Sequence, residues 1–342
     1  MKKIVLQNLT EDDYKKAGLQ KMKSGDFKAA ITNFSKALKI DPNNSNIYRL
    51  RGTAKCYSYK FREASADYSK ALIIDPFDAN LYLERGIARA YISSNHKAEF
   101  ADFNKSIELC PTNYIAYYFR GTTSYYLHDY NAAISDFNMY IENCPDFIAF
   151  YKQQGKKIKF AYMNSCKPGN KNYLEYIAPS GFDVYYFKSY CNYLLGNTSD
   201  ALDDVSNAIA CEPKNIDCYN LSARIKYSSG NFEAAFEDCN KAFNLDFLDW
   251  EANIISGDIR LKLGDLKAAL LYYNTGIGAS SVECDLYLKR GKIKHALNDL
   301  LGAFVDFKTA SELDPNDKNI LSLKEKTETE LIKFLESSPT MN

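Results

Sequence analysis

The sequence lacks an excess of charge of either sign. Its 342 residues include 43 lysines and arginines and 43 aspartates and glutamates, which leaves a formal net charge of +0. Proteins that bind nucleic acids usually carry a basic excess that neutralises phosphates, so we expect no nucleic-acid partner.

Long apolar runs are also absent. The N-terminal segment Met1–Gln7 contains three consecutive apolar residues. The apolar part of a secretory signal, by contrast, has roughly 7–15. No stretch reaches the roughly 18 apolar residues that a membrane-spanning helix needs. We therefore expect a cytoplasmic protein without a membrane span.

Residues that commonly carry catalysis or bind metals are sparse. The three histidines, at 96, 128 and 295, have no cysteine or acid at the spacing of a metal site or a catalytic triad. There is no Walker loop and no Gly-x-Gly-x-x-Gly motif. The nine cysteines include no Cys-x-x-Cys pair, and we expect them to be reduced core residues rather than a disulfide framework or a zinc site. These absences predict no enzyme, no metal and no cofactor.

What the sequence does contain is a repeat of 34 residues. Nine consecutive blocks begin at residues 11, 45, 79, 114, 148, 182, 216, 250 and 284, and only the third is longer, at 35 residues. Position 4 is tyrosine in eight of the nine blocks, and seven blocks have proline near position 32. Position 8 is glycine, serine or alanine in every block. Self-similarity at this period is the signature of an array of helical repeats.

Each repeated position has a physical reason. A small residue at position 8 lets the second helix of a hairpin approach the first, and alanine at position 20 completes the contact: Ala30, Ala64, Ala133, Ala201, Ala235, Ala269 and Ala303. Pairs such as Gly25-Asp26 and Gly264-Asp265 break the chain between the two helices. The proline ends the second helix because it has no N–H to donate. Each block therefore predicts one helical hairpin.

The segment from Leu19 to Pro42, which contains Gly-Asp-Phe-x-Ala-Ala-Ile and ends in Ile-Asp-Pro, resembles a tetratricopeptide repeat. The resemblance covers nine repeats over residues 11–317 and leaves no segment for a catalytic domain. It implies an all-α fold, a right-handed superhelical solenoid of helical hairpins with a C-terminal capping helix. It further implies a non-enzymatic adaptor whose first helices line a concave groove.

A second pattern links positions 7 and 23 within the blocks. Five blocks have a basic residue at position 7 and an aspartate at position 23: Arg51 with Asp67, Arg85 with Asp102, Arg120 with Asp136, Lys188 with Asp204, and Arg290 with Asp306. Where position 7 is Ser256, position 23 is Tyr272. We predict a partly exposed ion pair across each hairpin, structural in role and contributing about 0.5–1 kcal/mol.

The array predicts a division into six segments. They are a lead at 1–10, four repeats at 11–147, a degenerate fifth repeat at 148–181, four repeats at 182–317, a capping helix at 318–336 and a frayed tail at 337–342. In the capping helix, Ile320, Leu323, Leu331 and Phe334 are expected to face inward.

The fifth block departs from the pattern. Lys167 occupies position 20, and Pro168-Gly169 fall in the first turns of the expected second helix, where proline costs about 3 kcal/mol. Two interpretations stay open. The block is either a decayed spacer that its neighbours tolerate or a hinge and basic contact site between two rigid halves.

By resemblance, positions 2, 5, 9, 12 and 13 point into the groove. The aromatic residues there are Tyr57, Tyr91, Tyr118, Tyr125, Tyr126, Tyr186, Tyr190, Tyr193 and Tyr227. The basic ones are Arg49, Lys152, Lys156 and Lys159, and the acidic ones are Asp183, Asp217, Glu251 and Asp285. Tyrosine offers a large apolar face and a hydroxyl at low entropic cost, which favours a binding surface. The alternative is that these rings cover one another rather than a ligand.

The sequence therefore predicts a scaffold, a monomer or weak homo-oligomer, that holds a peptide or helix of a partner protein in a tyrosine-rich groove. A chaperone's acidic C-terminal tail is not the expected partner, because Lys15, Leu19, Leu50, Asn80 and Glu84 do not form the carboxylate clamp of that subtype. One alternative is a regulatory protein whose groove is filled by its own chain or a second copy. Another is a binder of single-stranded RNA, against which the neutral charge argues.

Overall fold

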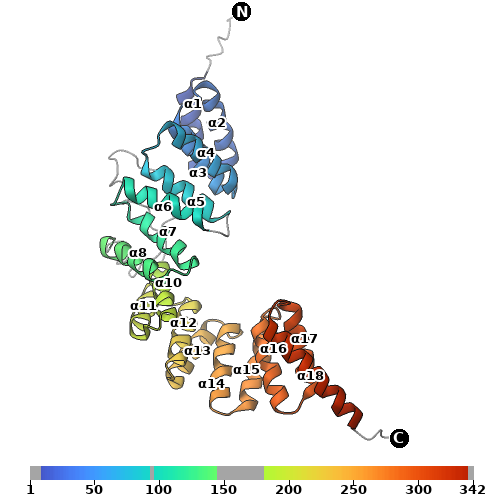
Figure 1. Ribbon diagram of the computed structural model, residues 1–342. Coiled ribbons are helices and arrows are strands. Elements are labelled where there is room, and N and C mark those ends of the chain that lie inside the picture. The colour runs from blue at the N-terminus through green and yellow to red at the C-terminus, as the bar shows by residue number, and fades with distance from the viewer. Residues whose placement is uncertain (1–8, 93–95, 145–180, 338–342) are drawn as a thin grey trace, which may run out of the picture. The chain divides into compact units, whose positions relative to one another are not determined.

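The computed structural model describes residues 9–92, 96–144 and 181–337, and these residues form seventeen helices and no strand (Figure 1). The all-α prediction is confirmed. The chain divides into two compact units, residues 1–197 and 198–342, here called the first unit and the second unit. Most of the fifth block, with Lys152, Lys156 and Lys159, lies outside the described residues, so the two interpretations of that block stay open.

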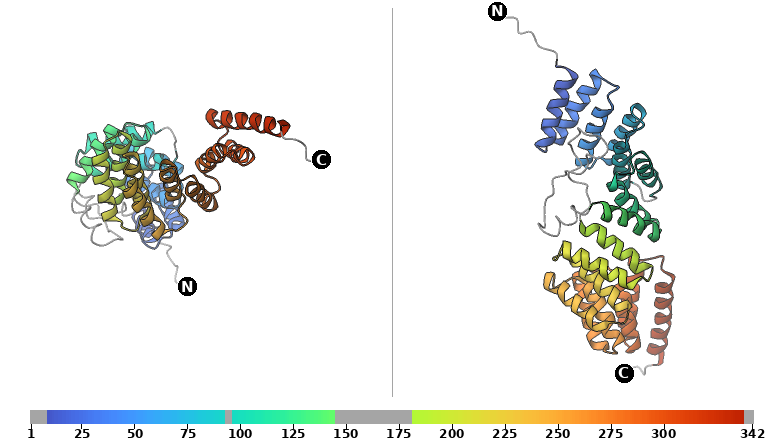
Figure 2. Two further views of the ribbon diagram at one scale, coloured as in Figure 1. Left: turned by 90° about the horizontal axis from the view of Figure 1, so that it is seen from below. Right: turned by 90° about the vertical axis from the view of Figure 1, so that its left-hand side faces the viewer.

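The first unit stacks helical hairpins, each a pair of helices joined by a short turn. Its described helices are α1 (Glu11–Lys23), α2 (Phe27–Ile40), α3 (Ser45–Tyr57), α4 (Phe61–Ile74), α5 (Ala79–Ala90), α6 (Lys97–Leu109), α7 (Tyr114–Tyr126), α8 (Tyr130–Asn143) and α10 (Gly181–Leu194). The two helices of a described hairpin pack on each other, α2, α4 and α6 each also pack on the first helix of the next hairpin, and α8 packs on α10 (Figures 1 and 2).

The second unit repeats this arrangement. Its described helices are α11 (Thr198–Cys211), α12 (Ile216–Ser228), α13 (Phe232–Leu245), α14 (Trp250–Lys262), α15 (Leu266–Ala279), α16 (Cys284–Ala296), α17 (Leu300–Leu313) and α18 (Lys318–Ser337). The last of these packs on α17.

The turns between paired helices explain why the helices end where they do. Gly25, Gly230 and Gly264 have φ of +77°, +81° and +79°, a left-handed conformation that costs glycine little. The next residue is an acid or amide whose side chain accepts a hydrogen bond from the backbone of the following helix, as Asp26 does from the N–H of Ala29. The predicted chain break is thus a glycine helix end followed directly by an N-cap.

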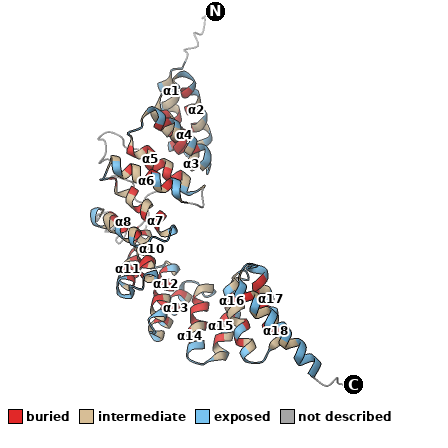
Figure 3. Ribbon diagram, in the orientation of Figure 1, coloured by how far each residue is buried: buried red, intermediate tan, exposed pale blue. Residues whose placement is uncertain are grey.

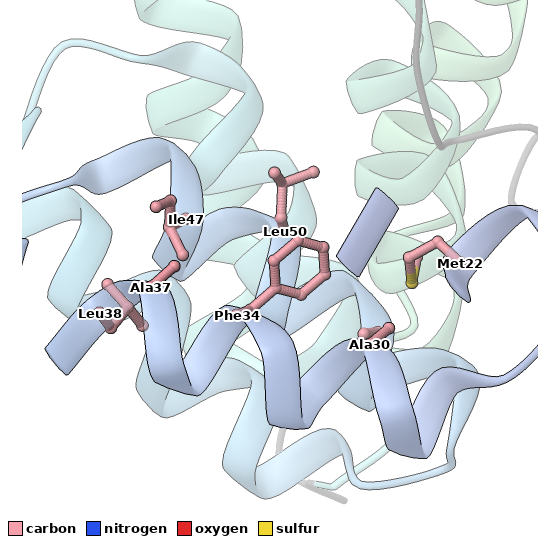
Figure 4. Packing of buried hydrophobic residues seen from close by; sticks show 8 residues of the cluster. Met22, Ala30, Phe34, Ala37, Leu38, Ile47 and Leu50 are labelled. Carbon is pink, nitrogen blue, oxygen red and sulfur yellow. The ribbon is translucent and has the colours of Figure 1, made fainter. Parts of the chain in front are cut away.

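Glycine at position 8 is required by an aromatic ring. A Cβ added to Gly18 would lie 2.5 Å from a ring carbon of Phe34, and one added to Gly257 would lie 2.4 Å from Tyr273. Figure 4 shows the Phe34 ring packed among the aliphatic residues of its hydrophobic cluster. The space that the small residue at position 8 leaves between the two helices is therefore filled by the ring at position 24.

The buried residues lie mainly between paired helices, as the red ribbon segments of Figure 3 show. In α18 the inward face ends early. Ile320 is buried as predicted, whereas Phe334 is 51% exposed, so its predicted inward position is wrong. A helix of 20 residues is longer than its neighbour of 14, and its last turns therefore extend past the surface that α17 offers.

The predicted ion pairs across the hairpins are present and more buried than expected. Arg51 donates to both carboxylate oxygens of Asp67, Nε to Oδ2 at 2.8 Å and Nη2 to Oδ1 at 2.7 Å. Arg85, Arg120 and Arg290 bind their aspartates in the same two-bond geometry. Lys188 belongs to the first unit and Asp204 to the second, so that pair stays a prediction.

Two further contacts around these pairs were not predicted. The remaining guanidinium nitrogen reaches the preceding hairpin, as when Arg120 Nη1 donates to Asn104 Oδ1 at 2.8 Å. In several hairpins a second cation, one turn after position 7, also binds the aspartate, as Lys55 Nζ does at 2.7 Å from Asp67 Oδ2. The arginine therefore connects neighbouring hairpins, while the buried aspartate binds cations of its own hairpin.

Most described cysteines are free thiols, as expected: 56, 144, 191, 211, 218, 239 and 284. Burial raises the pKa of Cys56 and of Cys239 to about 12. The prediction is wrong for Cys110, which is disulfide-bonded.

Candidate functional site

Five of the predicted groove tyrosines lie together in the first unit. Tyr125 and Tyr126 end α7, while Tyr186, Tyr190 and Tyr193 follow one another along α10 at the spacing of one helix face. We call these five residues the tyrosine cluster. Helix packing brings the two groups together although about 60 residues separate them in the sequence.

A continuous series of ring contacts joins the tyrosine cluster. The ring centroids of Tyr125 and Tyr126 are 5.2 Å apart, and those of Tyr125 and Tyr190 are 5.9 Å apart in an edge-to-face arrangement. Tyr190 in turn lies 6.4 Å from Tyr186 and 6.0 Å from Tyr193. These separations are typical of favourable aromatic pairs.

Core residues support the cluster from below. The ring centroid of Phe187 of α10 lies 5.4 Å from that of Tyr125 and 6.4 Å from that of Phe137 of α8. Phe187 therefore connects the cluster to the hydrophobic core. The pKa of Tyr125 is raised to about 12, mainly by burial and to a smaller extent by the neighbouring Tyr190. The Tyr125 hydroxyl therefore stays protonated at neutral pH and can donate a hydrogen bond.

The other side of the cluster reaches solvent. Tyr126 is 53% exposed and stacks on the His96 ring at 5.1 Å, while Tyr186, Tyr190 and Tyr193 are each half-buried. The cluster therefore offers accessible aromatic surface on a rigid base.

The other predicted tyrosines pack against the protein itself. Tyr57 stacks on Phe27 at 4.9 Å, and Tyr91 stacks on Phe61 at 4.4 Å, each ring on the first residue of the preceding hairpin's second helix. Tyr118 is only 8% exposed and belongs to the core. In the second unit, Tyr227 contacts Phe232 at 5.6 Å. Each of these rings thus has an aromatic or core partner within its own hairpin or in the preceding one, although Tyr91 is still 68% exposed.

Several of the predicted groove charges are already paired. Arg49 Nε donates to Glu84 Oε1 at 2.8 Å, across two neighbouring hairpins. Glu251 binds Arg224, and Asp285 lies 3.4 Å from Lys289. Pairing reduces the charge that these side chains offer to a partner.

The remaining two acids lie at helix starts. Asp183 is half-buried in the first turn of α10, and Asp217 is exposed in the first turn of α12. Negative charge there complements the helix dipole, which gives both residues a local structural role.

Sequence reasoning missed three residues around the cluster. His96 and Phe187 contact it directly, and Phe182 lies 5.4 Å from Tyr186. Phe182 stands four residues before Tyr186, and this i, i+4 spacing was the signal that could have identified it.

The described residues show no group that could hold a metal ion. Each histidine has a side-chain hydrogen-bond partner: His96 contacts Glu99 at 2.8 Å, His128 contacts Tyr130 at 2.9 Å, and His295 contacts Glu330 of α18 at 2.6 Å. Within the described ranges, no helix is long and apolar enough to cross a membrane.

Comparison with known families and structures gives matches over parts of the chain. Residues 18–55 match a family model described as a TPR repeat, and residues 216–247 match one described as a tetratricopeptide repeat. No curated protein matches the chain.

Three solved structures are similar in fold. The anaphase-promoting-complex hetero-tetramer Cut9–Hcn1 is 15% identical with a TM-score of 0.55, over 88% of this chain and 52% of that one, so this chain spans about half of its length. Yeast Tom70 is 15% identical with a TM-score of 0.52, over 98% of this chain and 67% of that one. A tetratricopeptide repeat protein from Parabacteroides merdae ATCC 43184 is 18% identical with a TM-score of 0.50, over 93% and 98%.

Proposed function

We propose that this chain, a tetratricopeptide repeat protein by its matches at residues 18–55 and 216–247, is a non-enzymatic scaffold in the cytoplasm that binds a peptide or helical segment of a partner protein at the tyrosine cluster. The fold supports protein–protein interaction in general, since helical repeats offer extended surfaces to partners. The location of the site on α7 and α10 is our proposal.

The observation that carries the proposal is the continuous, half-exposed ring series from Tyr126 to Tyr193. Tyrosine is enriched among residues that dominate binding energy, because its rigid ring buries much area at little entropic cost. The rings of the cluster also rest on Phe187 and the core, so binding need not order them first.

A capture experiment tests the location. The full chain, a Tyr126→Ala/Tyr190→Ala double variant and a Phe77→Ala control are used to capture partners from the source organism's lysate. Phe77 is a matched control because it is an aromatic residue of the same unit, 78% exposed in the turn between α4 and α5.

We expect the double variant to lose its partner at least about tenfold relative to both other proteins, the effect of removing a hot spot of about 2 kcal/mol or more. Circular dichroism and thermal unfolding check that the double variant is folded. Equal capture by all three proteins would exclude the tyrosine cluster as the binding site. Light scattering on the isolated chain tests the self-associating alternative, which a monomer would contradict.

A further inference from the structure

A buried carboxylate closes a polar triad in the seventh hairpin, which α12 and α13 form. Asp238 accepts a hydrogen bond from the Ser222 hydroxyl at 2.6 Å and pairs with the Lys226 ammonium. Ser222 and Asp238 are both buried. The aspartate thus satisfies two donors of the facing helix at once.

The eighth hairpin, formed by α14 and α15, has the two donors without the acid. Ser256, Arg260 and Tyr272 each follow their counterparts in the triad by one 34-residue repeat, and tyrosine replaces the aspartate. Ser256 Oγ and Arg260 Nε are both buried, and neither has a hydrogen-bond partner among the described residues. Only the Cys239 thiol, a weak partner, lies beside the serine hydroxyl. The two unsatisfied atoms are thus the donors that an acid would serve.

The cation of the eighth hairpin is held in place by a ring instead. The Arg260 guanidinium lies over the Phe236 ring at 4.8 Å from its centroid. Tyr272 packs edge-on against the same ring at 6.1 Å and stacks on Phe243 at 6.4 Å. Arg260 is half-buried as a residue, although its Nε atom is buried, and the contact with the ring holds the guanidinium in place.

The other hairpins show how this position is normally used. The cations equivalent to Arg260 lie next to the buried aspartate of their own hairpin: Lys55, Arg89, Lys226 and Lys294. Arg260 has no such acid, yet its guanidinium has the planar donor arrangement that binds two oxygens of one anion.

We propose that Arg260 is a binding site for an oxyanion, the carboxylate or phosphate group of a ligand, which supplies the negative charge that is missing at the position of Tyr272. The site belongs to the second unit and does not depend on the tyrosine cluster. Arginine binds both oxyanions through the same paired N–H donors, so the chemistry is shared and the source is a matter for experiment.

The test is a titration of the full chain with oxyanions, in which nuclear magnetic resonance monitors the Nε–H signals of the arginines. One arm uses inorganic phosphate, a second uses glutarate, and sodium chloride at equal ionic strength controls for screening. The Arg260 signal is assigned by its loss in an Arg260→Lys variant. We expect a saturable shift of this signal in at least one oxyanion arm, and the arm with the higher affinity identifies the source. No saturable shift in either arm would overturn the proposal.

Substituting the missing acid gives the decisive variant. Tyr272→Asp should reproduce the triad of the seventh hairpin and weaken oxyanion binding about tenfold or more, because the new carboxylate occupies the guanidinium. Tyr272→Phe keeps the ring and adds no acid, so its affinity should stay within about twofold of the unchanged protein. If Tyr272→Asp does not fold, Arg260→Gln must show the same loss. Unchanged oxyanion affinity in a folded Tyr272→Asp or Arg260→Gln variant would contradict the proposal.

Discussion

Removing Arg120 should destabilise its hairpin much more than removing Arg51 destabilises the equivalent one. Both arginines bind a buried aspartate with two hydrogen bonds, to Asp136 and Asp67 respectively. Asp67 keeps a second cation, because Lys55 Nζ lies 2.7 Å from it. In the hairpin of Arg120 the corresponding residue is Ser124, which brings no charge.

The magnitude follows from what each substitution leaves behind. Arg120→Met leaves the Asp136 carboxylate, 4% exposed, without a cation among the described residues, and an uncompensated buried charge costs about 3–5 kcal/mol. Arg51→Met removes charge-assisted hydrogen bonds but leaves the lysine pair, so we expect a loss of about 1–2 kcal/mol. Methionine keeps most of the unbranched stem, which limits the loss of packing.

Native-state hydrogen exchange measures both effects in comparable helices of one unit. Amides of α7 and α8 in Arg120→Met should lose protection by at least about a hundredfold, and amides of α3 and α4 in Arg51→Met by about tenfold. The double variant Arg51→Met/Lys55→Met should then approach the loss of Arg120→Met. Equal losses in the two single variants would refute the role that we assign to the second cation.

Three further predictions concern the second unit and the thiols. Burial raises the pKa of Asp238, but hydrogen bonds from Lys226, Lys241 and Ser222 outweigh burial and lower it. Asp238→Asn should therefore cost about 1.5–3 kcal/mol near neutral pH, a deficit that disappears as the pH falls below about 4, and denaturation across pH checks this. Gly257→Ala should lower stability by about 1–3 kcal/mol because of the Tyr273 ring. Gly278→Ala, with nothing within 4 Å, should raise stability by up to about 1 kcal/mol, and thermal unfolding separates the two. Cys56 and Cys239 should react with Ellman's reagent at pH 8 only after unfolding, because burial keeps both as thiols.

The helices and their pairing were predictable because they depend on local signals that recur. Most boundaries are marked within a few residues of sequence by a glycine helix end, an N-cap or a proline. The pairing of Arg51 with Asp67 was predictable for the same reason, since covariation between blocks reports contact. The ion pair of Lys55 with Asp67 was not predicted, because covariation was sought only between positions 7 and 23 and Lys55 is at position 11.

The exposure of individual tyrosines could not be read from the sequence. Tyr118 and Tyr126 occupy predicted groove positions on the same helix, yet one is core and the other is 53% exposed. The difference arises from which neighbouring helix covers each ring, and that depends on tertiary packing rather than on repeat position. The pairing of Arg49 with Glu84 likewise joins two hairpins whose residues no repeated column connects.

Site-specific photocrosslinking tests the proposed binding surface most directly. The photoreactive residue p-benzoylphenylalanine is placed at Tyr126 in one full-length protein and at Phe77 in another, and each is irradiated with the captured partner bound. We predict a covalent adduct with the partner from position 126 and none from position 77. An adduct of equal yield from position 77, or none from position 126 while the partner stays bound, would contradict the assignment of the tyrosine cluster as the binding site.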